Sequence, residues 1–154
     1  MRNQRRGYER AGLLASSNAA RLKPHGIFVK LKIEPEKWFL APADDVRSSD
    51  ALEDAATEFD VQGLELDWAC LCWDANLRRG SGWQTWRFRG TRWESINDPA
   101  RRAYLLNSYR VLLTRARQGL VVFVPHGSQD DRTRPPELYD DVYDFLITCG
   151  FDPL

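Results

Sequence analysis

The sequence is poor in lysine and contains no phosphate-binding loop. Only four of its 22 basic residues are lysine, and none of the four follows a glycine. The loop of P-loop NTPases, Gly-x-x-x-x-Gly-Lys-Ser/Thr, needs that Gly-Lys step. An acidic pair at the end of an apolar strand, which would hold magnesium, is also missing. We therefore expect no ATP hydrolysis by this chain alone.

Cysteine, histidine and long apolar runs are scarce as well. The three cysteines, Cys70, Cys72 and Cys149, are too few for a disulfide framework, which favours a reducing cytoplasm. Together with His25 and His126 they match no zinc spacing, so no metal site is predicted. Neither histidine has a nucleophile motif beside it, which argues against a hydrolytic triad. No apolar run approaches the roughly 18–20 residues of a membrane span, and we expect no membrane contact.

What the chain has in excess is arginine. Eighteen arginines and four lysines balance 22 acidic residues, so the formal net charge is zero. Arginine is favoured where a planar fork binds phosphate or carboxylate, or stacks on an aromatic ring. A neutral chain with local arginine clusters is compatible with binding nucleic acid. It is not a uniformly basic protein that coats DNA by charge alone.

The order of apolar and polar residues predicts an α/β fold. The length of 154 residues suits a single domain over 1–154, in which we expect the polar segment 1–10 to be poorly ordered. Strands separated by helical periods favour a mainly parallel sheet with flanking helices. Strands are predicted at 12–15, 28–33, 64–73 and 120–124. Helices are predicted at 19–22, 50–57, 99–115 and from about 138 to Gly150.

Residues 74–97 interrupt this alternation and predict an inserted hairpin rich in arginine and tryptophan. Indole rings beside guanidinium groups are typical of surfaces that bind single-stranded nucleic acid. The candidate residues are Trp83, Trp86, Arg87 and Arg89, with Arg92 and Trp93 further along the same hairpin. The alternative is a structural insertion whose tryptophans pack onto the sheet. From the residues alone the two interpretations weigh about equally.

Two other segments carry recognisable chemistry. In the first, a Gln62-Gly63 turn precedes Glu65, whose carboxylate could accept hydrogen bonds from a sugar hydroxyl. The alternative is an ordinary turn with a solvated glutamate. In the second, a predicted helix ends at Arg115 and Arg117. Cations there also complement the helix dipole, so neither segment is specific when taken alone.

Taken together and in order, the two segments resemble motifs V and VI of superfamily 1 helicases. The residues in and around these motifs are most similar to those of the Schlafen-like bacterial DNA/RNA helicase branch. The resemblance rests on Gly12-Leu13-Leu14-Ala15-Ser16-Ser17, Ala56-Thr57-Glu58-Phe59, Gln62-Gly63-Leu64-Glu65-Leu66-Asp67, Asn107-x-Tyr109-Arg110-Val111-Leu112-Leu113-Thr114-Arg115-Ala116-Arg117 and Asp131-x-Thr133-Arg134. Many relatives have histidine where this chain has Phe59. The resemblance therefore does not imply, for this chain, the motif V contact that the histidine makes in those relatives.

The resemblance implies the C-terminal, second RecA-like lobe of an ATP-dependent helicase or translocase. Arg115 would be the arginine finger of motif VI, acting on the γ-phosphate. Gln62, Gly63 and Glu65 would border the nucleotide with Arg117 nearby, and Thr57 would contribute to the nucleic-acid groove. ATP and Mg²⁺ would bind only in a composite site with a first, P-loop lobe, located in another chain or lost upstream. Single-stranded DNA or RNA is the implied partner.

A different class of function stays open from the sequence. The chain could be a non-catalytic nucleic-acid-binding or protein-interaction module kept after loss of the motor half, or the product of a decayed reading frame. Salt-dependent binding of single strands that does not change on Arg115→Ala would favour the module.

Overall fold

A five-stranded, wholly parallel sheet forms the centre of the protein. The computed structural model describes residues 7, 9–29 and 33–154, and the strand order is β2-β3-β1-β4-β8. The strands are β1 (Ala11–Ala15), β2 (Phe28–Val29), β3 (Asp54–Ala56), β4 (Leu66–Cys72) and β8 (Ala116–Phe123). The predicted α/β class with a mainly parallel sheet is confirmed.

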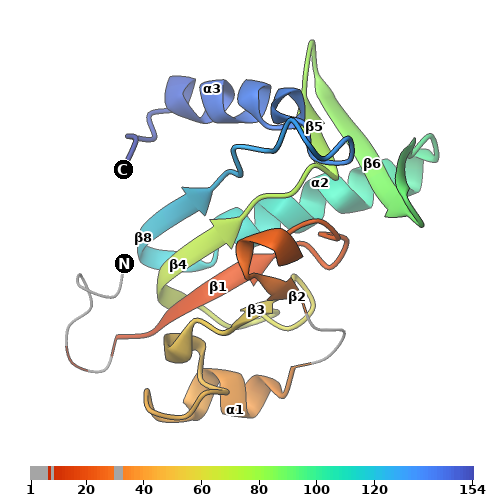
Figure 1. Ribbon diagram of the computed structural model, residues 1–154. Coiled ribbons are helices and arrows are strands. Elements are labelled where there is room, and N and C mark those ends of the chain that lie inside the picture. Colours follow the sequence, from red (N-terminus) through yellow and green to blue (C-terminus); the bar gives the residue numbers. More distant parts are fainter. Residues whose placement is uncertain (1–6, 8, 30–32) are drawn as a thin grey trace.

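Few helices flank the sheet. They are α1 (Pro35–Leu40), α2 (Pro99–Leu113) and α3 (Asp140–Thr148), with 3₁₀ turns η2 (Lys23–His25), η3 (Ser49–Ala51) and η4 (Pro136–Leu138). In Figure 1, α2 crosses behind β4 and β8 while α3 runs along the top. The Asp98 carboxylate caps α2 by accepting from the Arg101 backbone N–H at 2.8 Å, and Pro99 starts the helix, as predicted.

Two predicted helices are wrong. Residues 50–57 form the end of η3 and then β3, an inner strand between β2 and β1. The local start signal at Asp50 is overridden because its carboxylate accepts from the Ala11 backbone N–H at 2.9 Å. Residues 19–22 form no helix, since the helical turn comes later, at η2, where Gly26 ends it with a φ of 73°.

The other boundaries differ less. The strand predicted at 28–33 is described only as β2, because residues 30–32 lie outside the described residues. Strand β8 begins four residues earlier than predicted, and the short helix α1 was not predicted.

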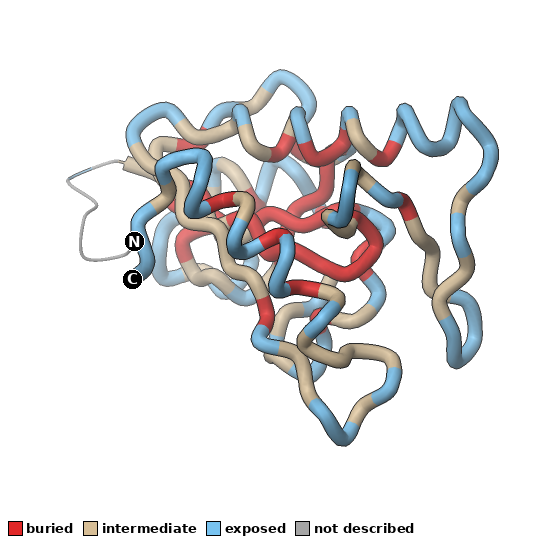
Figure 2. Tube along the Cα trace, turned by 90° about the horizontal axis from the view of Figure 1, so that it is seen from above, coloured by how far each residue is buried: buried red, intermediate tan, exposed pale blue. Residues whose placement is uncertain are grey.

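Among the described residues the larger of two buried hydrophobic clusters contains Trp73, together with residues of the sheet, α2 and α3. The Trp73 ring lies 4.4 Å from the Tyr109 ring of α2 and 5.8 Å from Trp83, measured between centroids. Trp83 in turn meets Phe145 of α3 at 5.3 Å. Figure 2 shows the buried residues gathered along the central strands. Sheet, α2 and α3 are thus joined through aromatic packing.

The segment predicted as a hairpin is a three-stranded antiparallel sheet. Its strands are β5 (Leu77–Arg79), β6 (Trp83–Arg89) and β7 (Arg92–Ser95), in the order β5-β6-β7. It leaves the central sheet after β4 and returns through α2 (Figure 1). The Trp86 backbone N–H donates to the Asn76 carbonyl at 2.7 Å, which fixes β6 beside the segment that follows β4.

Gly119 of β8 lies directly against the Trp68 ring, and a substitution there tests this close contact. A Cβ atom at Gly119 would lie 2.3 Å from Cζ3 of Trp68, whose indole N–H donates to Glu9 Oε2 at 3.0 Å. Gly119→Ala is therefore expected to lower the free energy of unfolding by about 1–3 kcal/mol. Gly82→Ala is the control, because no heavy atom lies within 4 Å of its Cβ position. Equal urea midpoints for the two variants would contradict this packing.

Candidate functional site

The parallel sheet separates the predicted site residues into two groups. All strands of such a sheet begin at one edge and end at the other. Gln62, Gly63 and Glu65 precede β4, and Arg115 immediately precedes β8, so these residues belong to the amino edge. Thr57 follows β3 and belongs to the carboxyl edge.

At the amino edge, the two predicted nucleotide segments lie side by side. The Leu66 backbone N–H donates to the Arg115 carbonyl at 2.9 Å, and Leu66 pairs with Ala116. Glu65 and Arg117 form an ion pair at 3.8 Å, with both side chains more than 60% exposed. Such a pair contributes little stability and leaves both groups accessible to a ligand.

Gln62 and Gly63 lie on the exposed turn that leads into this edge. Both residues are exposed. Gly63 has a φ of 75°, which favours glycine, and no atom lies within 4 Å of the Cβ position there. The backbone of this turn is therefore open to close approach by another molecule.

Arg115 is half-buried at the end of α2 and binds only neutral oxygens. Its Nε donates to the Val111 carbonyl at 3.1 Å, and Nη2 donates to Thr114 Oγ1 at 3.3 Å. Among the described residues no carboxylate lies within ion-pair distance of its guanidinium. Its positive charge is uncompensated there, as a group that binds phosphate requires.

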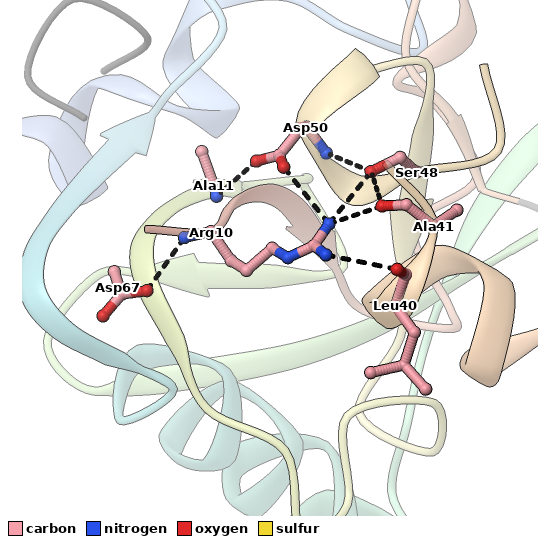
Figure 3. A network of polar contacts seen from close by, with 7 residues as sticks. All are labelled: Arg10, Ala11, Leu40, Ala41, Ser48, Asp50 and Asp67. Atoms are coloured by element: carbon pink, nitrogen blue, oxygen red, sulfur yellow. Dashed lines mark hydrogen bonds and ion pairs between the residues drawn. The ribbon is translucent and has the colours of Figure 1, made fainter. Parts of the chain in front are cut away.

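A network around Arg10 fastens the same edge (Figure 3). The Arg10 backbone N–H donates to Asp67 Oδ2 at 2.8 Å, and its guanidinium donates to the Ala41 carbonyl at 2.6 Å and pairs with Asp50 at 3.3 Å. These contacts join the start of β1 to the start of β4 and to the loop after α1.

The Arg10 network was not foreseen from the sequence. Segment 1–10 was expected to be poorly ordered, and its Glu9 and Arg10 are instead held by side-chain contacts. Residues 1–6 and 8 lie outside the described residues. No sequence signal marks the network, since its partners lie 30 to 57 positions from Arg10.

At the carboxyl edge, Glu58 is the centre of the polar contacts. Its carboxylate accepts from the Ser17 backbone N–H at 2.8 Å, the Ser17 hydroxyl at 2.6 Å and the Tyr104 hydroxyl at 2.9 Å. Thr57, predicted to face nucleic acid, is buried, and its hydroxyl donates to Asp60 at 2.7 Å. Thr57 therefore shapes this edge rather than presenting a free hydroxyl.

A second buried polar cluster supports the carboxyl edge from inside. The Tyr109 hydroxyl donates to Asn76 Oδ1 at 2.6 Å, and Asn76 donates to the Ser16 hydroxyl at 3.2 Å. Asp74 accepts from the Arg21 backbone N–H at 3.0 Å, and burial raises the pKa of its carboxyl group. The cluster locks the ends of β1 and β4 to α2.

In the hairpin, the tryptophans have partners within the protein. Trp83 packs into the core, Trp86 lies under the Arg78 guanidinium at 4.4 Å, and Trp93 donates its indole N–H to the Thr133 carbonyl at 2.7 Å. All three side chains are partly exposed.

Three of the hairpin arginines converge on a single carboxylate, that of Glu94. Arg87 pairs with Glu94 at 3.1 Å, and Arg89 approaches it at 4.0 Å while staying 67% exposed. Arg92 approaches it at 3.5 Å and is 78% exposed. Three guanidinium groups sharing one carboxylate leave this rim with excess positive charge.

Two buried tyrosines and the partly exposed Tyr104 make stability sensitive to alkaline pH. Burial raises the pKa of Tyr104 to about 12, helped by its bond to Glu58, and raises the pKa values of Tyr109 and Tyr139 above the usual 10. The folded state therefore holds these protons more tightly than the unfolded chain. Their stabilising contribution is complete below about pH 10 and is lost as pH rises toward 12.

We accordingly expect the urea midpoint to fall between about pH 10 and pH 12, and to fall less steeply in Tyr104→Phe. A midpoint that stays constant over this range would contradict the tyrosine environments.

Two features are absent from the part of the chain that the structure describes. There, no three His, Cys, Asp or Glu side chains gather as metal ligands would. Nor does any helix in residues 7, 9–29 and 33–154 have the length and apolar character needed to cross a bilayer.

Comparison with known proteins identifies the family. The sequence model of the Schlafen group 3 DNA/RNA helicase domain matches residues 1–126, which include both edges of the sheet and the whole hairpin. No curated protein and no solved structure matches the chain. The match supports a helicase-type function, including nucleic-acid binding, in general terms. This chain belongs to the Schlafen group 3 DNA/RNA helicase domain family.

Proposed function

We propose that the chain is the second RecA-like lobe of an ATP-dependent DNA or RNA helicase or translocase, and that Arg115 is its arginine finger. The observation that carries the proposal is the hydrogen bond from Leu66 N–H to the Arg115 carbonyl at 2.9 Å. It brings the motif V-like and motif VI-like segments together at one edge. The parallel order β2-β3-β1-β4-β8 is compatible with a RecA-like sheet.

The residues at the amino edge fit one side of a nucleotide site. Arg115 offers a cation bound only to neutral oxygens, and the Gln62-Gly63 turn is open for backbone contact. Glu65 and Arg117 are exposed beside them and only loosely paired. The sequence supplies no P-loop and no Gly-Lys step. ATP, when bound between lobes, supplies the free energy for movement, and a separate P-loop lobe must hold its phosphates and Mg²⁺.

In the composite site, each of these amino-edge residues has a separate role. The Arg115 fork stabilises the charge that develops on the transferring phosphoryl group. The Gly63 backbone borders the nucleotide, and the Glu65 carboxylate accepts from a ribose hydroxyl. Arg117, loosely paired with Glu65, lies beside the nucleotide without holding Glu65 in position.

The test is reconstitution with a P-loop lobe of this family supplied as a second chain. The isolated chain is expected to show no ATP hydrolysis above background in a coupled assay. Mixing the two lobes is expected to restore hydrolysis stimulated by single-stranded nucleic acid. Robust turnover by the isolated chain, abolished by Arg115→Ala, would contradict the proposal.

A non-catalytic nucleic-acid-binding module is the second candidate, favoured by the exposed arginine rim of the hairpin. It would bind single strands in a salt-dependent way, weaken on Arg89→Ala or Trp86→Ala, and respond to no P-loop lobe. Dependence on Arg115 separates the two candidates.

A further inference from the structure

Two large aromatic rings are exposed side by side at the carboxyl edge. Phe59, three residues after β3, is 58% exposed, and Tyr104 of α2 is 42% exposed. Their ring centroids are 6.1 Å apart with an interplanar angle of 27°, a stacked arrangement. Adjacent exposed aromatic rings commonly mark a binding surface.

The Tyr104 ring is held in place from beneath. Its hydroxyl donates to Glu58 Oε1 at 2.9 Å, and Glu58 is only 4% exposed. Glu58 is held in turn by two hydrogen bonds from Ser17. Because its polar end is fixed, the ring offers its face with little loss of conformational freedom on binding.

A groove of about 500 Å³ adjoins Tyr104 between the hairpin and the start of α2. Most of the residues that line it are polar by type, and they include Asn18, Asn97, Arg87 and Arg101 and one acidic residue, Asp98. Arg87 pairs with Glu94. The Arg101 guanidinium forms no ion pair or side-chain hydrogen bond with the described residues, whereas the Arg101 backbone N–H donates to Asp98.

We propose that Phe59 and Tyr104 form a stacking platform for a base of single-stranded DNA or RNA, with Arg101 binding a neighbouring phosphate. Stacked rings beside a cation and amides are what an unpaired nucleotide needs, because the base has a flat face, polar edges and an adjacent negative charge. The polar side chains of Asn18, Asn97 and Arg101 in this groove suit the edges and phosphate of a nucleotide. The inference rests on the nucleic-acid part of the proposed function and adds the site itself.

The test measures binding by the full chain alone, without ATP or a P-loop lobe. Fluorescein-labelled oligo-dT and oligo-U are the probes, and anisotropy gives the dissociation constants. Phe59→Ala is expected to weaken binding about 5- to 150-fold, the range for loss of one base stack. Tyr143→Ala is the matched control, because Tyr143 of α3 is 45% exposed but, among the described residues, has no ring contact with Phe59 or Tyr104.

Salt dependence separates the two kinds of contact. Arg101→Gln is expected to reduce the slope of log affinity against log salt by about 0.7, while Phe59→Ala leaves that slope unchanged. Thermal unfolding of each variant shows that the fold is kept. The ratio between the oligo-dT and oligo-U constants tells DNA from RNA.

Each outcome bears on the inference. If the wild type binds either probe and Phe59→Ala loses no more affinity than Tyr143→Ala, the platform is refuted while the proposed function stands. If the wild type binds neither probe at low salt, both the platform and the nucleic-acid part of the proposed function are refuted. The ATP hydrolysis that depends on Arg115 is measured in the two-lobe assembly. Neither binding result changes what that separate assay is expected to show.

Discussion

Replacing Arg115 by alanine is expected to lower nucleic-acid-stimulated ATP hydrolysis of the two-lobe assembly by about 10³- to 10⁵-fold. The reason is that the Arg115 guanidinium has no carboxylate partner among the described residues and sits where the motif V-like and motif VI-like segments meet. The main-chain bond from Leu66 to the Arg115 carbonyl survives the substitution. A steady-state coupled assay at saturating nucleic acid measures the rate.

Two variants control this prediction. Arg110→Ala removes an exposed arginine of the same helix whose side chain contacts only Asn107 in the described structure, and it is expected to leave the rate unchanged. Arg115→Lys keeps the charge but loses the planar fork, so an intermediate rate is expected. A loss below about tenfold in Arg115→Ala would remove Arg115 from the proposed role.

Trp73→Ala is expected to have the largest effect on stability, about 3–5 kcal/mol of the free energy of unfolding. Trp73 is only 2% exposed, and its ring stacks on Trp83 of β6 and packs at a tilt against Tyr109 of α2. Its indole N–H donates to the Leu77 carbonyl at 2.8 Å. The substitution therefore leaves a cavity where sheet, hairpin and α2 meet, and urea unfolding measures the loss.

Trp73→Phe separates the contributions at this position. It keeps an aromatic ring but leaves the buried Leu77 carbonyl without its donor, so a smaller loss of about 1–3 kcal/mol is expected. Phe28→Ala, at an exposed ring, is the control and is expected to change stability by less than about 0.5 kcal/mol. Losses of similar size for Trp73→Ala and Phe28→Ala would mean that Trp73 does not join these elements.

The parts of the fold that sequence could predict have strong local patterns. Strand β4 and helix α2 agree with prediction because an apolar run marks the first, and a capped start with a helical stripe marks the second. Strand β3 was mistaken for helix because it is short and rich in alanine. In addition, the Asp50 carboxylate that suggested a helix cap accepts instead from the backbone N–H of Ala11, in a different strand. Tertiary contacts overrode the local preference.

The candidate site also has features that the sequence predicts and features that only the folded chain shows. The order of the Gln62-Gly63 and Arg115 segments was visible in the sequence, and the structure brings the two segments together. The contacts of Glu58 were not visible, because Ser17 and Tyr104 lie 41 and 46 positions away. Phe59 stood out only as a departure from the histidine of many relatives, and its stacking on Tyr104 needed the folded chain.

The central claim, that this chain donates an arginine to a shared ATP site, is tested most directly by a transition-state analogue. The measurement is the affinity of the two-lobe assembly for ADP–aluminium fluoride and for ADP alone, with and without Arg115→Ala. The account predicts that the substitution weakens binding of the analogue at least about 100-fold more than binding of ADP. Equal weakening for the two ligands, or none for either, would contradict it.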